Sequence, residues 1–269
     1  MTRIIQISDP HIVPNGQLAY GQVDTAAALA SCVKTVNRLL PEIGPVDLAI
    51  VTGDITDFGT KEEYQLFHEI MEPLKLPYRA IPGNHDNVVN MRACFSDQSW
   101  MPSTGPINWT IEFDDLVLIA LDSSIPGQAH GHLSEETLSF LVNTLERQNG
   151  LPALVALHHP PITTGIEKMD IQNLRDSAKL EAILSGYPGE LRLICGHVHR
   201  NIVAPFGSII CQIAPGVSHA VSMDLRPSAP NCLTKEPGGV LLHETRAGIV
   251  THHIPTGQFP GPFLFYPDG

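Results

Sequence analysis

The sequence is poor in the features that mark several classes of protein. Its 269 residues include five cysteines, an odd number without CxxC spacing, which indicates buried or partly buried reduced thiols rather than a disulfide framework. The 16 lysines and arginines form no run, and the formal net charge of −12 would repel a nucleic-acid backbone. We therefore expect no nucleic-acid polymer among its partners.

Long hydrophobic runs are also missing. The apolar stretch 116–121 is far shorter than the roughly 20 residues that a membrane-spanning helix needs. Residues 1–9 lack the basic and apolar regions of a signal peptide, so we expect a cytoplasmic protein with no membrane partner. A hydrophobic content of 43% is typical of a globular chain, and the length suits a single domain over 1–269.

Strand-like and helix-like segments alternate along most of the chain. A strand over 3–8 is followed by a helix over 24–40, with Asp24 as N-cap and Pro41 as its end, and by a strand over 47–52. This βαβ rhythm predicts an α/β fold with two halves, joined by a hairpin around 114–115. The further expected elements are helices over 61–74, 134–147 and 177–184 and strands over 78–81, 109–113, 116–121, 154–157 and 191–195.

The region after residue 201 is less regular. Strand-like runs over 208–213, 239–244 and 249–254 are expected to complete the second sheet. The stretches 14–22 and 220–238 are rich in turn-forming residues and are expected to form lid or rim loops.

Seven residues of metal-binding type lie in five short clusters, each after an expected strand. In an open α/β sheet, loops at the carboxyl ends of the strands converge on one crevice, so side chains that are far apart in sequence become neighbours. We therefore expect one shared metal site. The seven residues are Asp9, His11, Asp54, Asn84, His158, His197 and His199.

The residue types and spacings suit two cations. Asp9 and His11 are separated by one residue, so that both side chains of an extended segment face the same way. Asp54 has two carboxylate oxygens and can bridge two ions, whereas Asn84 adds a ligand without charge. Taken singly, a turn or a helix cap explains Asp9 or Asp54 better than a metal does, but five clusters in this order favour metal binding. Two divalent ions, two carboxylates and a hydroxide leave a charge of about +1, which suits a monoanionic phosphodiester.

Together these motifs resemble those of the calcineurin-like metallophosphoesterases, whose signature is D-x-H, GD, GNH-D/E, H and GHxH. All five blocks occur here in order, within residues 4–219. Within that superfamily the chain is similar to class III cyclic nucleotide phosphodiesterases and bacterial glycerophosphodiesterases. The resemblance implies a four-layer α/β/β/α sandwich with two mixed β-sheets.

The resemblance also implies roles for individual residues. His85 would contact the scissile phosphate or protonate the leaving oxygen, Asp86 would orient His85, and His219 would be a substrate-side histidine; Asn84 would also contact substrate. Two ions, drawn from Fe, Mn, Co or Zn, would be bound with Asp54 as the bridge. The implied ligands are Asp9, His11, Asp54 and His199 for one ion and Asp54, Asn84, His158 and His197 for the other.

The implied activity is hydrolysis of a small phosphodiester, a cyclic nucleotide or a glycerophosphodiester, by in-line attack of a metal-bound hydroxide. Two alternatives remain. A phosphomonoesterase would usually need arginine near the site, and the motif loops contain only Arg200. A non-catalytic scaffold should lack ligands, whereas all seven positions are competent. The sequence leaves open the metal pair, the role of 220–238 and the oligomeric state, including a homo-oligomer.

Overall fold

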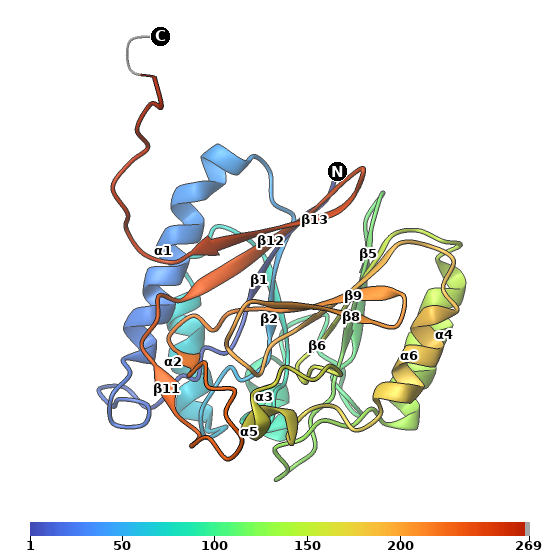
Figure 1. Ribbon diagram of the computed structural model, residues 1–269, viewed down its shortest axis with the longest axis horizontal. Helices are drawn as coiled ribbons and strands as arrows, with labels where there is room; N and C mark the ends of the chain where they lie inside the picture. The colour runs from blue at the N-terminus through green and yellow to red at the C-terminus, as the bar shows by residue number, and fades with distance from the viewer. Residues whose placement is uncertain (267–269) are drawn as a thin grey trace.

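Two β-sheets face each other in the centre of the protein, with helices on both outer faces (Figure 1). The computed structural model describes residues 1–266. The first sheet has the order β13-β12-β1-β2-β3 and the second β4-β5-β6-β7-β9-β8. This arrangement confirms the expected α/β/β/α sandwich of two mixed sheets.

The strands of the first sheet are β1 (Arg3–Ile7), β2 (Leu48–Thr52), β3 (Tyr78–Ile81), β12 (Gly239–Arg246) and β13 (Gly248–Pro255). Those of the second are β4 (Trp109–Glu112), β5 (Val117–Leu121), β6 (Ala153–Leu157), β7 (Leu191–Cys195), β8 (Ile202–Phe206) and β9 (Ile209–Ile213). A short ribbon outside both sheets pairs β10 (Ala220–Val221) with β11 (Leu233–Thr234).

The helices lie outside the two sheets. They are α1 (Thr25–Ile43), α2 (Lys61–Met71), α3 (Val88–Cys94), α4 (Glu135–Arg147), α5 (Glu167–Asp170) and α6 (Ser177–Ser185). Figure 1 shows α1 and α2 beside the first sheet and α4 and α6 against the outer face of the second. No helix within residues 1–266 is long and apolar enough to cross a membrane.

The central strands are buried on both faces. All five residues of β2, β5 and β6 are buried, as expected for parallel strands covered on both sides. One core fills the space between the sheets and includes Ile50, Leu118 and Ile194, while a second lies beneath α4 and α6. The strands thus form a rigid base for the loops that follow them.

Parallel pairing brings the important loops to one edge. Strands β1, β2 and β3 run parallel to one another in the first sheet, as do β5, β6 and β7 in the second. The loops after β1, β2, β3, β6 and β7 therefore converge at the carboxyl ends of these strands.

Several details differ from the expectations. Strands β12 and β13 do not complete the second sheet, because β12 pairs antiparallel with β1 in the first. Pro41 does not end α1, since the helix continues to Ile43. A proline this close to the C-terminus removes only one amide donor, and Gly44, with a φ of 78°, ends the helix instead. The sequence patterns missed α3, α5 and β8.

Candidate metal centre and active site

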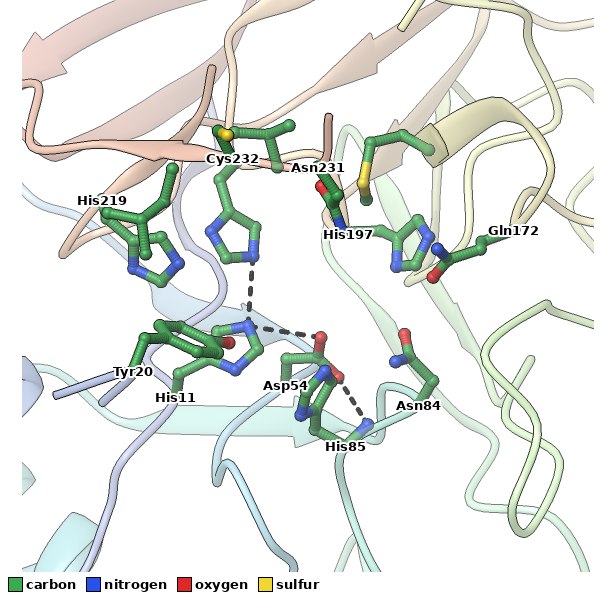
Figure 2. A pocket seen from close by; sticks show the side chains of 14 residues that line it. His11, Tyr20, Asp54, Asn84, His85, Gln172, His197, His219, Asn231 and Cys232 are labelled. Atoms are coloured by element: carbon green, nitrogen blue, oxygen red, sulfur yellow. Dashed lines mark hydrogen bonds and ion pairs between the residues drawn. The ribbon is translucent and has the colours of Figure 1, made fainter. Parts of the chain in front are cut away.

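Asp54 lies at the centre of the converging loops, 2% exposed. Its Oδ2 atom is 3.4 Å from His11 Nε2 and 3.3 Å from His158 Nε2. His11 Nε2 also faces His199 Nε2 at 3.0 Å, and His158 Nε2 lies 3.3 Å from Asn84 Oδ1. Figure 2 shows His11, Asp54 and Asn84 around a common space, with His197 on its other side.

The backbone at these loops is strained. Eight non-glycine residues have a positive φ within the described part of the chain, and five of them are predicted ligands. An L-residue in this region costs on the order of 1–2 kcal/mol relative to ordinary backbone, and such strain gathers at functional sites. The fold therefore holds these side chains in place at a cost in stability. The five are Asp9 (φ 54°), His11 (47°), Asp54 (48°), His197 (75°) and His199 (54°).

Two glycines allow the loops to approach each other. A Cβ atom on Gly53 would lie 2.3 Å from His158 Nδ1, and one on Gly83 would lie 2.2 Å from Asp54 Oδ1. Gly53 also has a φ of 91°, which favours glycine. The glycines before Asp54 and Asn84 are thus required by packing.

Hydrogen bonds fix how two imidazoles are presented. His158 Nδ1 donates to the Thr52 carbonyl oxygen at 2.8 Å, and His11 Nδ1 lies 2.9 Å from Asp57 Oδ1. With Nδ1 occupied, each ring turns Nε2 toward the cluster, an arrangement typical of metal-binding histidines. Asp9 is held similarly, since its carboxylate accepts from the His197 amide at 2.9 Å.

The candidate ligand atoms are crowded together, and not all of them are paired with one another. The candidate atoms of Asp9, His11, Asp54 and His199 all lie within 4.8 Å of one another, and all four residues are buried. His197 Nε2 is buried and has no hydrogen-bond partner among residues 1–266. The facing His11 and His199 nitrogens form a hydrogen bond only if one ring donates from Nε2, and the buried, unpaired His197 nitrogen is unfavourable unless a cation accepts its lone pair.

The local electrostatics agree with this in part, since at His158 the effect of burial is outweighed by Asp54, which raises the pKa of that ring to about 9. Burial raises the pKa of Asp9, whereas at Asp54 the effect of burial is outweighed by His158 and His85, which hold the pKa of that carboxyl well below its usual range. Burial lowers the pKa of His197 well below its usual range. A bridging carboxylate and a neutral imidazole are the forms that bind metals.

His85 is supported by Asp57. Its Nδ1 donates to the Asp57 carbonyl oxygen at 2.9 Å and is 3.4 Å from Asp57 Oδ1. Burial would lower the pKa of His85, but Asp54 and Asp57 raise it to about 10. Asp57 also accepts from the Tyr20 hydroxyl at 3.2 Å. The ring of His85, 35% exposed, therefore reaches the pocket while held from behind.

The interpretation of Asp86 as the residue that orients His85 does not agree with its contacts. The Asp86 carboxylate instead accepts from the amides of Ile55 and Gly83, at 3.1 and 2.9 Å, and from the Tyr64 hydroxyl at 2.9 Å. It therefore ties together the loops after β2 and β3. Asp57, which sequence reasoning left unassigned, takes the orienting position, and its place three residues after Asp54 was the available signal.

A pocket of about 210 Å³ opens over these residues. His219 lies in its wall with its ring centroid 4.5 Å from that of His199. The loop 14–22 contributes Tyr20, and the segment 220–238 contributes Asn231 and the exposed Cys232. Both expected rim segments thus form part of the wall (Figure 2).

Comparisons with known proteins agree with this geometry. The family model described as calcineurin-like phosphoesterase matches residues 2–201. A probable glycerophosphodiester phosphodiesterase GpdQ from Arcobacter nitrofigilis is 42% identical over 98% of this chain and 96% of its own. The 3',5'-cyclic adenosine monophosphate phosphodiesterase CpdA of Pseudomonas aeruginosa is 30% identical over 80% of this chain and 79% of its own. In fold, the chain resembles a dimetal phosphatase from Danio rerio, with a TM-score of 0.62 at 12% identity, covering 95% of this chain and 99% of that one.

Proposed function

The chain belongs to the calcineurin-like phosphoesterase family, and from this premise we propose that it is a two-metal phosphodiesterase acting on small diesters. The observation that carries the proposal is the position of Asp54. Its carboxylate lies within 3.4 Å of His11 and His158, which follow strands of two different sheets. A cation beside this carboxylate would also give the buried Nε2 of His197, unpaired among the described residues, a partner.

Asp54 would bridge the two ions. Asp9, His11 and His199 would complete one site, and Asn84, His158 and His197 the other. Such nitrogen and oxygen ligands accept Fe, Mn, Co or Zn. When bound, two cations polarise phosphoryl oxygens and activate water at neutral pH.

His85 would act on the leaving group. Its Nδ1 is committed to Asp57, so Nε2 is the atom that faces substrate. Cations near Asp54 would cancel the influence of that carboxylate on His85, but Asp57 would remain beside the ring. We therefore assign His85 as the proton donor to the departing oxygen and Asp57 as its positioning residue.

The charge of the pocket favours diesters over monoesters. None of the described residues that line it is lysine or arginine. Arg200 follows the ligand His199 but forms a double hydrogen bond with Glu236, at 3.1 and 3.0 Å, and donates to the Val221 carbonyl. It therefore holds the 220–238 segment and is not free to bind a dianionic phosphate.

Glycerophosphodiesters are the better candidates among small diesters. The relative that is 42% identical to this chain is named as a probable glycerophosphodiester phosphodiesterase, and the similarity covers nearly its whole length. The pocket is small, and its wall includes the amides of Gln172 and Asn231, which suit hydroxyl groups. The 30% identical CpdA keeps a cyclic nucleotide as the second candidate.

A substrate panel tests the proposal. Metal-loaded protein is compared on glycerophosphoethanolamine, cAMP, bis-p-nitrophenyl phosphate and p-nitrophenyl phosphate, with Asp54→Ala as the background control. We expect the glycerophosphodiester to give the highest kcat/KM and the monoester the lowest. A monoester preference would overturn the diester assignment. Inactivity and absence of bound metal after supply of Mn²⁺, Co²⁺ or Zn²⁺ would support a non-catalytic scaffold instead.

A further inference from the structure

A chain of polar side chains crosses the apolar core directly beneath the metal ligands. Gln6 of β1 is fully buried, and its amide nitrogen donates to Thr52 Oγ1 and to the Cys195 carbonyl oxygen, both at 3.0 Å. Thr52 is the last residue of β2 in the first sheet, and Cys195 is the last residue of β7 in the second. One side-chain amide thus connects the ends of two strands in different sheets.

The donor and the acceptor can be assigned for each hydrogen bond from Cys195 through Gln6 and His243 to Arg192. The Cys195 carbonyl can only accept, so the amide nitrogen of Gln6 faces it and Gln6 Oε1 faces His243 Nε2 at 3.0 Å. His243 therefore donates from Nε2 and accepts at Nδ1 from the Thr251 hydroxyl at 2.9 Å, and that hydroxyl accepts from Arg192 at 2.8 Å. Burial lowers the pKa of His243 to about 3, which keeps this ring neutral. A fully satisfied buried network of this kind specifies one arrangement.

Both ends of the amide bridge lead to metal ligands. The Thr52 carbonyl oxygen accepts from His158 Nδ1 at 2.8 Å, and Asp54 follows two positions later. His197 lies two positions after Cys195. The bridge therefore sets the separation between the loop that carries Asp54 and the loop that carries His197.

We infer that Gln6 is a positioning residue for the metal centre, because its amide fixes the two strand ends from which Asp54 and His197 emerge. The inference rests on the proposed two-metal function. Gln6 has no access to substrate, so its role would be in metal affinity. Residues that orient metal ligands from behind typically change metal affinity about 10- to 100-fold when replaced.

A second polar connection between the sheets provides a matched control. At the opposite end of β1, Thr245 Oγ1 donates to the Asp115 carboxylate at 2.6 Å, and Thr2 Oγ1 donates to the same carboxylate at 2.5 Å. This connection also joins β12 to the hairpin of the second sheet. Its loss should lower stability without reaching the metal ligands.

The experiment measures metal retention by the full-length protein. Wild type, Gln6→Leu, Thr52→Val and Thr245→Val are loaded with Mn²⁺ and titrated with a chelator, and retained metal is counted by mass spectrometry. Melting temperatures are recorded in parallel. We expect Gln6→Leu to weaken Mn²⁺ affinity about 10- to 100-fold. Thr52→Val removes one acceptor of the Gln6 amide and the hydroxyl that donates to Ser8 Oγ, leaves the bond from Gln6 to Cys195, and should weaken the affinity less. Thr245→Val should lower the melting temperature with metal affinity unchanged within about twofold.

Each result has a defined meaning. Wild-type metal affinity in both Gln6→Leu and Thr52→Val would overturn the inference, as would an equal loss in Thr245→Val. If Gln6→Leu does not fold, Thr52→Val decides, because valine has nearly the same shape as threonine. Failure of the wild type to retain two ions would contradict the proposed function itself.

Discussion

Replacement of His85 by alanine should remove the proton donor while leaving the metal ligands intact. The ring is held by the Asp57 carbonyl at 2.9 Å, and with cations at Asp54 the Asp57 contacts still favour its protonated form. A positioned general acid is worth about 10²- to 10⁴-fold in rate, which corresponds to about 2.7–5.4 kcal/mol of the barrier at 1.36 kcal/mol per factor of ten. We expect this full loss of kcat only for substrates whose leaving group needs a proton.

Two substrates and one control variant separate this role from simple phosphate binding. An alkyl diester such as glycerophosphoethanolamine expels an alkoxide and should show the full loss, whereas bis-p-nitrophenyl phosphate expels a stable phenolate and should lose less than about tenfold. Metal content should match that of the wild type. His132→Ala makes the same chemical change at a half-exposed histidine paired with Asp176, outside the pocket, and should leave kcat unchanged. Equal losses on both substrates would show that His85 only binds phosphate, and undiminished turnover would remove its role.

Three further changes test other parts of the structure. Asp54→Ala should lose bound metal and activity together in metal analysis and assay, and an active, fully metallated variant would contradict the bridge. Arg200→Met breaks a partly exposed pair worth at most about 1 kcal/mol, so KM should rise no more than about fivefold; a loss near a hundredfold would place Arg200 on the phosphate instead. Burial lowers the pKa of His243 in the folded protein to about 3. As the pH falls from about 6.5 toward 3, the unfolded chain therefore binds a proton at this ring that the folded chain does not. The free energy of unfolding should decrease over this window by up to about 1.4 kcal/mol for each unit by which the pH falls. Urea unfolding should show that His243→Gln removes this slope, and an unchanged slope would contradict the neutral buried ring.

The strands and the convergence of the candidate ligands could be predicted because their signals are local. Apolar runs such as 48–52 and 191–195 are short and end directly at the motif residues, so periodicity and spacing place the loops. The sheet assignment of β12 is different. It depends on long-range pairing of Leu241 with Gln6, and no pattern within β12 distinguishes one sheet from the other.

The supporting residues were harder to predict for a related reason. Asp57 and Asp86 are both carboxylates close in sequence to motif residues, and spacing does not show which one faces His85. Asp86 is adjacent to His85, yet its side chain turns away to bind the amides of Ile55 and Gly83, while Asp57 reaches His85 from another loop. The tertiary approach of two loops, held close by glycine, decides the matter.

Crystals of the protein grown with Mn²⁺ and measured at the manganese absorption edge would test the central claim most directly. We predict two anomalous peaks about 4 Å apart, with the Asp54 carboxylate coordinating both. A single peak, or a pair of peaks that Asp54 does not connect, would contradict the account.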